Sequence, residues 1–188
     1  MNVIRFMQEY VKQPRMIGAI LPSSKQLAKQ MVSLICFKKA KCIIEFGPGT
    51  GIFTEELMKQ RYPGTILILI EQNQAFYKKL SEKYMYKENV YIVHDSAENV
   101  HHYIEKYEIQ KTDYIVSGLP FTSLPFRVSK NILYRTKNIL GEDGTFIAFQ
   151  YTKLKKLLSS VFSNIEVEKV YWNIPPAYVY TCKVKLNV

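Results

Sequence analysis

The segment KCIIEFGPGTGIFTEEL, residues 41–57, decides the fold, because it joins an apolar run to an amphipathic run through a turn that contains three glycines. Gly47, Gly49 and Gly51 allow a backbone with positive φ and a close approach to a ligand. A glycine-rich turn that follows a strand and opens a helix is typical of nucleotide sites in doubly wound α/β sheets. The segment therefore predicts such a sheet, with a nucleotide-like ligand at the end of one strand.

Short β-rich runs alternate with helix-length segments on both sides of this turn. The runs predicted as strands are residues 41–46, 65–71, 89–95, 112–118 and 144–151. The segments predicted as helices are residues 52–61, 73–86, 97–108, 124–140 and 152–162. Strands that are apolar throughout and separated by helices indicate a parallel sheet covered on both faces.

The end of the chain departs from this alternation. NIEVEKVYWN and AYVYTCKVKL are separated only by IPP, which leaves no room for a helix, so the two runs are predicted to form an antiparallel hairpin. The predicted fold class is thus α/β: a doubly wound, Rossmann-like, seven-stranded and mostly parallel sheet with an antiparallel C-terminal hairpin.

Residues 1–40 are predicted to form an N-terminal helical cap, and residues 41–188 the core of the same single domain. Apolar residues within 3–11 recur at helical spacing, which predicts an amphipathic helix. A second helix is predicted to begin with Ser23 or Ser24 as its N-cap.

The formal net charge of +10 lies at the two ends of the chain. Residues 1–41 carry +7, residues 42–152 carry −1, and residues 153–188 carry +4. Such a distribution would attract an anionic partner, either nucleic acid or an acidic lipid surface. A solubilising surface charge is the simpler alternative.

The apolar runs, the N-terminal residues and the cysteines indicate the compartment of the protein. No apolar run approaches the roughly 20 residues that span a bilayer, and MNVIRFMQEYVKQPR has charges among its apolar residues and no cleavage-like site, unlike a signal peptide. Cys36, Cys42 and Cys182 are far apart and form no metal-binding spacing. These features predict a cytoplasmic protein with free thiols and no metal.

The spacing of the glycine turn excludes two common ligands. A dinucleotide fingerprint needs glycine at its sixth position, where Ile52 stands, and a phosphate loop needs a following Gly-Lys-Ser/Thr, which is missing. Glu45 comes just before the turn, which makes a polyphosphate a poor fit. The turn suits a ligand that carries a positive centre.

EFGPGTG resembles the first motif, acid-x-Gly-x-Gly-x-Gly, of the class I S-adenosylmethionine-dependent methyltransferases, and the resemblance extends over roughly residues 41–150. It implies S-adenosylmethionine as the cofactor. The cofactor-binding residues that it implies are Glu45, Phe46, Gly47, Gly49, Gly51, Glu71, Gln72, Asp95, Ser96 and Ser117.

Two strand ends carry this resemblance beyond the turn. Glu71 ends the second predicted strand, 20 residues after Gly51, where the family has the acid that holds the ribose hydroxyls. Asp95, with Ser96 beside it, ends the third, where the family places a polar residue against the adenine amino group. The alternatives are a solvated strand end for Glu71 and a helix cap for Asp95.

The acceptor site is predicted at the end of the fourth strand, in Ser117-Gly118-Leu119-Pro120-Phe121. The segment resembles the Asn-Leu-Pro-Phe/Tyr motif of rRNA adenine N6-dimethyltransferases, in which the Asn amide and a carbonyl take the amino hydrogens and the ring stacks on the base. Gly118 stands in place of Asn. The resemblance then implies an amine held by backbone carbonyls and by the Phe121 ring. Simple packing of Phe121 is the alternative.

A second resemblance covers nearly the whole chain. PRMIGAILPSSKQLAKQM, EFGPGTG, SGLPFTSLP and NIPPAYVY together resemble the bacterial phospholipid N-methyltransferases. This implies methylation of a phosphatidylethanolamine-type head group by a protein peripheral at the inner face of the membrane, with the N-terminal helix in the bilayer interface. A cap helix packed on the core is the alternative for that helix. Ser23 and Tyr178 are predicted to line the acceptor site.

An RNA adenine N6-methyltransferase is the alternative function, and a non-catalytic binding module is a third. Positive charge and overall similarity favour RNA. Against it stand Gly118 and the 37 residues after position 151, which the last strands use, so that a C-terminal helical domain is not expected. The sequence makes no prediction of oligomeric state.

Overall fold

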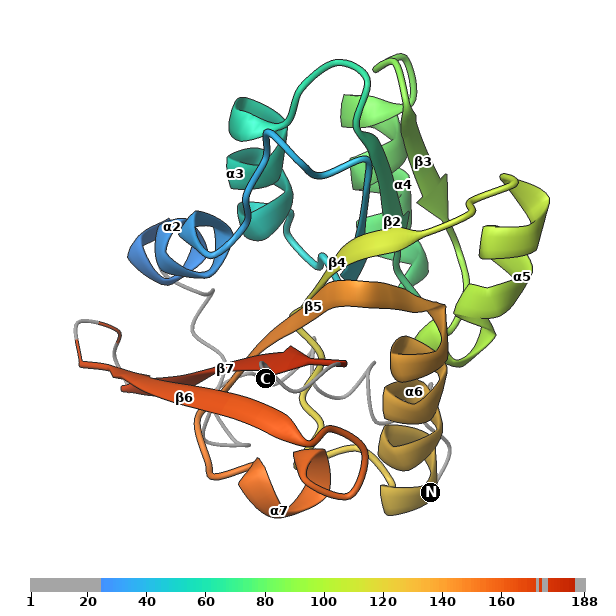
Figure 1. The fold of residues 1–188 in the computed structure, drawn as a ribbon. Helices are drawn as coiled ribbons and strands as arrows, with labels where there is room; N and C mark the ends of the chain where they lie inside the picture. The colour runs from blue at the N-terminus through green and yellow to red at the C-terminus, as the bar shows by residue number, and fades with distance from the viewer. Residues whose placement is uncertain (1–24, 172, 174–175, 185–188) are drawn as a thin grey trace.

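The computed structural model describes residues 25–171, 173 and 176–184. They form one seven-stranded sheet, and helices cover both of its faces (Figure 1). The strands are β1 (Cys42–Phe46), β2 (Ile66–Ile70), β3 (Val90–Val93), β4 (Thr112–Ser117), β5 (Leu140–Gln150), β6 (Asn164–Val170) and β7 (Ala177–Lys183). The helices are α2 (Lys25–Ser33), α3 (Ile52–Gln60), α4 (Gln74–Tyr84), η1 (Ala97–Asn99), α5 (Val100–Lys106), α6 (Phe126–Ile139) and α7 (Lys155–Leu158).

The sheet has the strand order β3-β2-β1-β4-β5-β7-β6. The first five strands are parallel, whereas β7 pairs antiparallel with both β5 and β6. The chain thus runs outward from β1 through β2 to β3 and then returns to the other side of β1 with β4. In open α/β sheets, this reversal marks the edge where ligands bind. The predicted fold class, including the terminal hairpin, is confirmed.

The two sheet faces bury separate apolar clusters. Alternating β1 residues explain the separation, because Cys42, Ile44 and Phe46 join the cluster with α5, α6 and α7, whereas Ile43 joins the cluster with α2, α3 and α4. All five β1 residues are buried, as expected of a central parallel strand.

Helix α2 packs on the sheet together with α3. Its residues Leu27, Ala28, Met31 and Val32 are fully buried in the same cluster as Ile43. Within the described part of the chain, the predicted boundary at residue 40 therefore does not divide two separate hydrophobic cores. The predicted helix within 3–11 and the cap residues Ser23 and Ser24 lie outside the described residues.

Strand β5 begins earlier than the sequence predicts, at Leu140 instead of residue 144. Its register against β4 shifts between Thr112 and Tyr114, which pair with Leu140 and Thr145. The added residues at the start of β5 form an irregular segment, which the alternation of apolar and polar residues in the sequence does not reveal.

Two helices are shorter than predicted. The segment 97–108 divides into η1 and α5, and the segment 152–162 contains only α7. Ahead of α7, the backbone N–H of Leu154 donates to the Tyr180 hydroxyl at 2.8 Å. This bond ties the segment after β5 to β7.

Candidate active site

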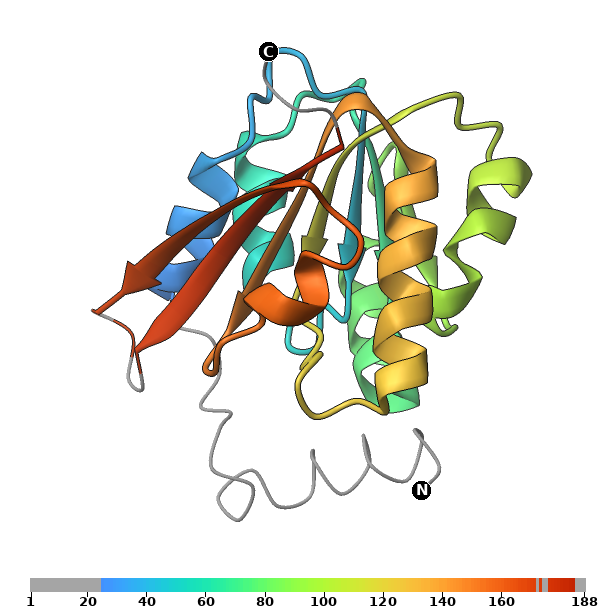
Figure 2. The ribbon, with the colours of Figure 1, turned by 60° about the horizontal axis from the view of Figure 1, so that its bottom comes forward.

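A pocket opens at the carboxyl edge of the sheet, where the chain reverses between β1 and β4. Figure 2 shows the parallel strands pointing to this edge, with the start of α6 beside it. The pocket has an apolar wall and a polar rim formed by four strand-end side chains. It is lined by Gly47, Ile70, Glu71, Gln72, Asp95, Ser96, Ala97, Leu119, Leu124, Val128 and Ile132.

The glycine turn comes close to the acceptor loop, residues 118–125. Gly47, Gly49 and Gly51 have φ values of +63°, +56° and +84°, a region that side chains disfavour. A Cβ on Gly47 would lie 2.7 Å from Leu119 Cδ2. Glycine at this position therefore lets the turn and the acceptor loop meet without a clash.

Glu71 links the glycine turn to the start of α4. Its side chain is 2% exposed, and its Oε2 accepts the backbone N–H of Gly49 at 2.8 Å while Oε1 accepts that of Asn73 at 2.7 Å. Burial raises the pKa of this carboxyl, although the backbone N–H donors of Asn73, Gly49 and Gln72 lower it in part. The carboxylate oxygens retain further acceptor capacity for two hydroxyl donors.

Asp95 is held in place by its neighbours. Its Oδ2 accepts the Tyr103 hydroxyl at 2.7 Å, and its Oδ1 accepts the Asn99 side chain at 2.9 Å and the Ser96 N–H at 2.6 Å. Burial opposes ionisation, yet the hydrogen bonds from Tyr103 and Asn99 outweigh it and leave the pKa of Asp95 below its usual value. Asp95 is thus an oriented, ionised acceptor at the pocket rim, and it is not a helix cap, because the Ser96 side chain caps η1.

Glu45 lies beneath the turn and does not line the pocket. Its side chain is fully buried, and its Oε2 accepts the Thr54 hydroxyl of α3 at 2.7 Å. Burial raises the pKa of Glu45 to about 8, and the nearby Glu71 adds to this effect. Within the described part of the chain, Glu45 Oε1 has no hydrogen-bond partner.

Two other residues predicted to bind the cofactor are also packing residues here. Phe46 is 0% exposed in the core, and a Cβ on Gly51 would lie 3.2 Å from Leu80 of α4. The prediction that they touch a cofactor receives no support from the pocket lining. Phe46 ends β1 inside the core, and Gly51 is the N-cap residue of α3.

Gly118 is restricted by the backbone of the glycine turn. Its N–H donates to the Phe46 carbonyl at 2.9 Å, and a Cβ at position 118 would lie only 2.9 Å from the Gly47 carbonyl oxygen. That contact is with backbone, which cannot rotate away like a flexible side chain. An asparagine could replace Gly118 only if the turn moved.

Several carbonyls of the acceptor loop accept internal hydrogen bonds. Leu119 C=O accepts from Phe121 N–H and from the Gln150 side chain, and Pro120 C=O accepts from Ser123 N–H and Leu124 N–H. Phe121 C=O accepts the hydroxyl of a buried serine in α6. Among the described residues, no hydrogen bond to the Gly118 carbonyl is found.

Gln150 positions the acceptor loop from the end of β5. It is 4% exposed, and its Nε2 donates to Leu119 C=O at 2.7 Å and to Phe149 C=O at 2.6 Å. Its Oε1 receives weaker contacts from Thr122 at 3.4 and 3.5 Å. Sequence analysis missed this residue, since a glutamine at a strand end carries no motif.

The Phe121 ring does not face the pocket. It is 2% exposed and lies edge-on to Phe146 with ring centroids 6.1 Å apart. The ring therefore packs in the core, as the alternative interpretation held, and the prediction that it contacts the acceptor is not supported by this arrangement. Ser117 is likewise buried, and its hydroxyl accepts the Leu119 N–H at 3.2 Å.

Tyr178 lies at the acceptor end of the sheet. It is half-buried and is paired with Gln150 across β5 and β7, so the two side chains lie on the same face. Its proximity to the acceptor loop agrees with the predicted lining role, which stays a prediction. The other predicted lining residue, Ser23, lies outside the described residues.

The donors and acceptors of the pocket fit S-adenosylmethionine. A buried carboxylate with spare acceptor sites suits the ribose diol, and an apolar wall ending at Asp95 suits the face and the amino edge of adenine. The glycine turn offers close backbone approach without a lysine, as a cationic ligand requires.

The matching family model is that of the ribosomal RNA adenine dimethylases, and it covers residues 2–168. The chain belongs to this family. Two relatives differ in the acceptor that their names state.

An ornithine lipid N-methyltransferase of Singulisphaera acidiphila is 27% identical over 182 residues, which cover 95% of this chain and 94% of the relative. The ribosomal RNA small subunit methyltransferase A of Mycoplasma mycoides subsp. mycoides SC is 28% identical over 130 residues, 69% of this chain but only 46% of that protein. The chain thus spans about half of the rRNA enzyme it matches.

Solved structures show the same fold at low sequence identity. The N-methyltransferase NodS of Bradyrhizobium japonicum, in complex with S-adenosylhomocysteine, superposes with a TM-score of 0.69 over 97% of this chain and 98% of its own, at 11% identity. The 1,6-didemethyltoxoflavin-N1-methyltransferase of Burkholderia thailandensis has the same TM-score at 12% identity, covering 97% and 88%. This member of the dimethylase family is an S-adenosylmethionine-dependent methyltransferase.

Two features are absent from the described residues. None of their helices has the length and apolarity to cross a bilayer. Nor do they contain a group of three or more His, Cys, Asp or Glu side chains that could hold a metal ion.

Proposed function

We propose that this methyltransferase transfers the methyl group of S-adenosylmethionine to the primary amine of a lipid head group of the phosphatidylethanolamine type. The observation that carries the proposal is Gly118. The Gly47 carbonyl leaves no room for a Cβ there, and the Gly118 carbonyl has no intramolecular donor among the described residues. A small amine can use such a carbonyl without a side-chain amide.

The cofactor would occupy the pocket on the β1–β3 side. In this proposal Glu71 accepts the ribose hydroxyls, Asp95 accepts the adenine amino group, and Leu119 and Val128 contact the base from the apolar wall. When bound, S-adenosylmethionine supplies an electrophilic methyl group on a sulfonium centre.

The acceptor loop would orient the nucleophile. An amine attacks through its lone pair, so it must be neutral at transfer, and a carbonyl that takes one of its N–H groups fixes the direction of that lone pair. Gly118 C=O is suited to this role, and Gln150 holds the adjacent Leu119 carbonyl in place. The described residues at this loop present no evident general base, so solvent can take the proton.

The relatives support a lipid more than RNA. The lipid enzyme matches nearly end to end, whereas the rRNA enzyme matches over less than half of its own length. Ornithine lipid and phosphatidylethanolamine share a primary amine on a membrane-bound molecule, so the proposal concerns that shared chemistry. RNA adenine N6-methylation is the second candidate, and the family model favours it.

Transfer of label from S-adenosylmethionine tests the proposal. The full chain is incubated separately with vesicles that contain phosphatidylethanolamine, with vesicles that contain ornithine lipid, and with ribosomal RNA. Label in either lipid supports lipid N-methylation and shows which amine is preferred. Label in RNA alone would establish the second candidate.

A further inference from the structure

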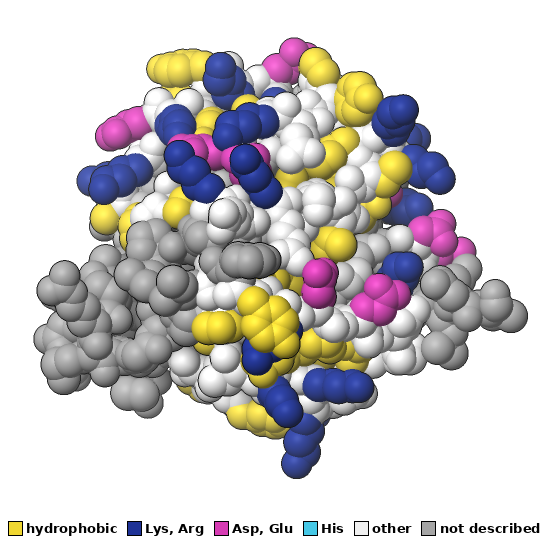
Figure 3. All heavy atoms as spheres, turned by 90° about the vertical axis from the view of Figure 1, so that its left-hand side faces the viewer, with side chains coloured by type: hydrophobic (Ala, Val, Ile, Leu, Met, Phe, Trp, Pro, Cys, Tyr) yellow, Lys and Arg dark blue, Asp and Glu magenta, His cyan; other side chains and the backbone are white. Residues whose placement is uncertain are grey.

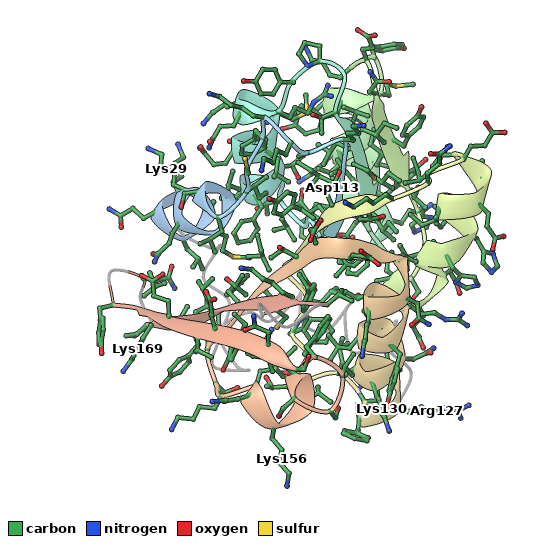
Figure 4. The ribbon with its side chains drawn as sticks, in the orientation of Figure 1. Lys29, Asp113, Arg127, Lys130, Lys156 and Lys169 are labelled. Carbon is green, nitrogen blue, oxygen red and sulfur yellow. The ribbon has the colours of Figure 1, made fainter. Side chains whose placement is uncertain are left out.

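Several cations lie at the same carboxyl edge of the sheet as the acceptor loop, and all of them except the half-buried Lys130 are exposed. They come from three places that are distant in sequence: the first turns of α6, the segment around α7, and the end of β6. Figure 4 shows Arg127, Lys130 and Lys156 along the lower edge of the molecule and Lys169 at the outer end of β6. We name this set the basic rim: Arg127, Lys130, Lys153, Lys155, Lys156 and Lys169.

No carboxylate lies in the chain segments that supply most of the basic rim. Acidic residues are absent between Asp113 and Glu142 and again between Asp143 and Glu166. None of the ion pairs found among the described residues involves the basic rim. Its six positive charges are part of the net charge of +10 that the chain carries.

Some cations elsewhere on the surface form ion pairs. On the side of α3 and α4, Lys59 pairs with Glu56 at 2.6 Å and Lys83 pairs with Glu55 at 2.5 Å. Figure 3 shows this mixture of signs at the top of one face, whereas the lower edge of the same face carries Lys and Arg beside hydrophobic side chains. The basic rim thus differs in its charge pattern from the surface of α3 and α4.

Two exposed aromatic rings accompany the basic rim. Phe126, at the start of α6, is 70% exposed, and Tyr171, after β6, is 67% exposed. The ammonium group of Lys169 lies 4.8 Å from the centre of the Tyr171 ring and 5.8 Å from that of Tyr178. Rings mixed with Lys and Arg are typical of surfaces that meet the head-group region of a bilayer.

We propose that the basic rim, with Phe126 and Tyr171, is the surface that docks this enzyme on an anionic bilayer. The inference rests on the proposed function, since a lipid amine stays at the membrane surface and the acceptor loop must come to it. The face that surrounds this loop must then contact the head groups. That face has the charge and the exposed rings that such contact favours.

Vesicle binding tests the proposal without any methyl transfer. The full chain is sedimented with vesicles of phosphatidylcholine that contain one third phosphatidylglycerol, and with vesicles of phosphatidylcholine alone. Neither lipid offers a primary amine, so the readout is independent of activity. The rim variant is Arg127→Glu/Lys156→Glu/Lys169→Glu. The control is Lys38→Glu/Lys39→Glu/Lys87→Glu, which changes the net charge equally at exposed sites on the opposite edge of the sheet.

The wild type and the control are expected to bind the anionic vesicles similarly, and the rim variant at least about tenfold more weakly. Equal binding by the rim variant and the wild type, or equal losses in both variants, would overturn the proposal. So would wild-type binding to ribosomal RNA without binding to vesicles. Rim-dependent vesicle binding by a protein that methylates no lipid would support the docking surface and remove the proposed function.

Phe126→Ala provides a second variant that leaves the charge unchanged. The side chain is mostly exposed, so the fold does not depend on it. High salt weakens the contribution of the cations, and the remaining binding is then expected to fall by about threefold or more in this variant. Unchanged binding at high salt would exclude Phe126 from the docking surface.

Discussion

The two halves of the carboxyl edge are built in opposite ways. On the β1–β3 side, the strand ends carry Glu45, Glu71 and Asp95, and hydrogen bonds from neighbouring groups hold all three. On the β4–β7 side, the acceptor loop has Gly118 and its backbone carbonyl. The cations of the basic rim lie at the same edge of the sheet.

This difference corresponds to what each half is proposed to hold. A cofactor with fixed hydroxyl and amino groups is recognised by oriented side chains. A lipid amine that arrives from a surface needs one acceptor and a surrounding field that attracts its membrane.

The largest expected effect concerns the burial of Glu45 on the cofactor side. Its pKa is raised from 4.5 to about 8, so between these values the folded protein binds a proton that the unfolded chain releases. The free energy of unfolding should therefore fall as pH rises through this window, by roughly 3–5 kcal/mol from this group. Urea unfolding at pH 5 and pH 9 measures the change.

Glu45→Gln is the matched control for that measurement, because an amide can still accept the Thr54 hydroxyl but carries no charge. We expect its stability to vary much less over the same pH range. An equally steep pH dependence in the variant would show that the burial of Glu45 is not the cause.

The next effect concerns Glu71. Glu71→Ala removes the proposed ribose acceptor and leaves the N–H groups of Gly49 and Asn73 without their partner. The dissociation constant for S-adenosylmethionine should rise about 10- to 100-fold, since hydrogen bonds to a charged group are worth about 1.5–3 kcal/mol. Calorimetry provides the measurement, and unchanged affinity would contradict the ribose assignment.

Substitution of Gly118 tests the acceptor half. Gly118→Ala places a Cβ 2.9 Å from the Gly47 carbonyl oxygen, and overpacking of this kind costs about 1–3 kcal/mol. Turnover should fall about tenfold or more. The control is Gly64→Ala, where a Cβ would meet nothing within 4 Å, so its turnover should stay near that of the wild type.

Gly118→Asn tests whether position 118 can accept the asparagine of the adenine motif. If the backbone of the turn excludes a side chain at position 118, the asparagine of the adenine motif cannot take its place there. The variant should lose activity on lipid without gaining activity on RNA. Efficient RNA methylation by this variant would show that position 118 alone selects the acceptor.

The smallest effect concerns Gln150. Gln150→Leu removes the donor to Leu119 C=O, and turnover should fall severalfold to about tenfold, as a lost hydrogen bond of about 1 kcal/mol implies. The affinity for S-adenosylmethionine should stay within about twofold. The control is Thr122→Val, which removes only the weak contact of the hydroxyl at 3.4 Å and keeps that of the backbone N–H at 3.5 Å. Equal losses of turnover and affinity in Gln150→Leu would indicate a structural role alone.

The cofactor side could be predicted far better than the acceptor side. Glu71 and Asp95 follow strands whose apolar runs are evident, so their convergence at one edge follows from the parallel topology. The pocket lining brings Gly47, Glu71, Gln72, Asp95 and Ser96 together with Leu119. Whether these side chains contact the cofactor is still a prediction.

The remaining features depend on packing between distant segments. The hydrogen bond of Tyr103 to Asp95, the reach of Gln150 to the acceptor loop and the burial of the Phe121 ring leave no local pattern in the sequence. A motif shows which residue occupies position 121 but not which way its ring turns. The register shift in β5 is hidden for the same reason.

Backbone NMR with two unreactive ligands tests the division of the edge most directly. S-adenosylhomocysteine should perturb the amides of Gly47, Gly49, Gln72 and Ser96, and a soluble short-chain phosphatidylethanolamine added afterwards should perturb Gly118 and its neighbours in the acceptor loop. The account predicts two largely separate sets of residues. One common set for both ligands, or no response to S-adenosylhomocysteine around Gly49, would contradict it.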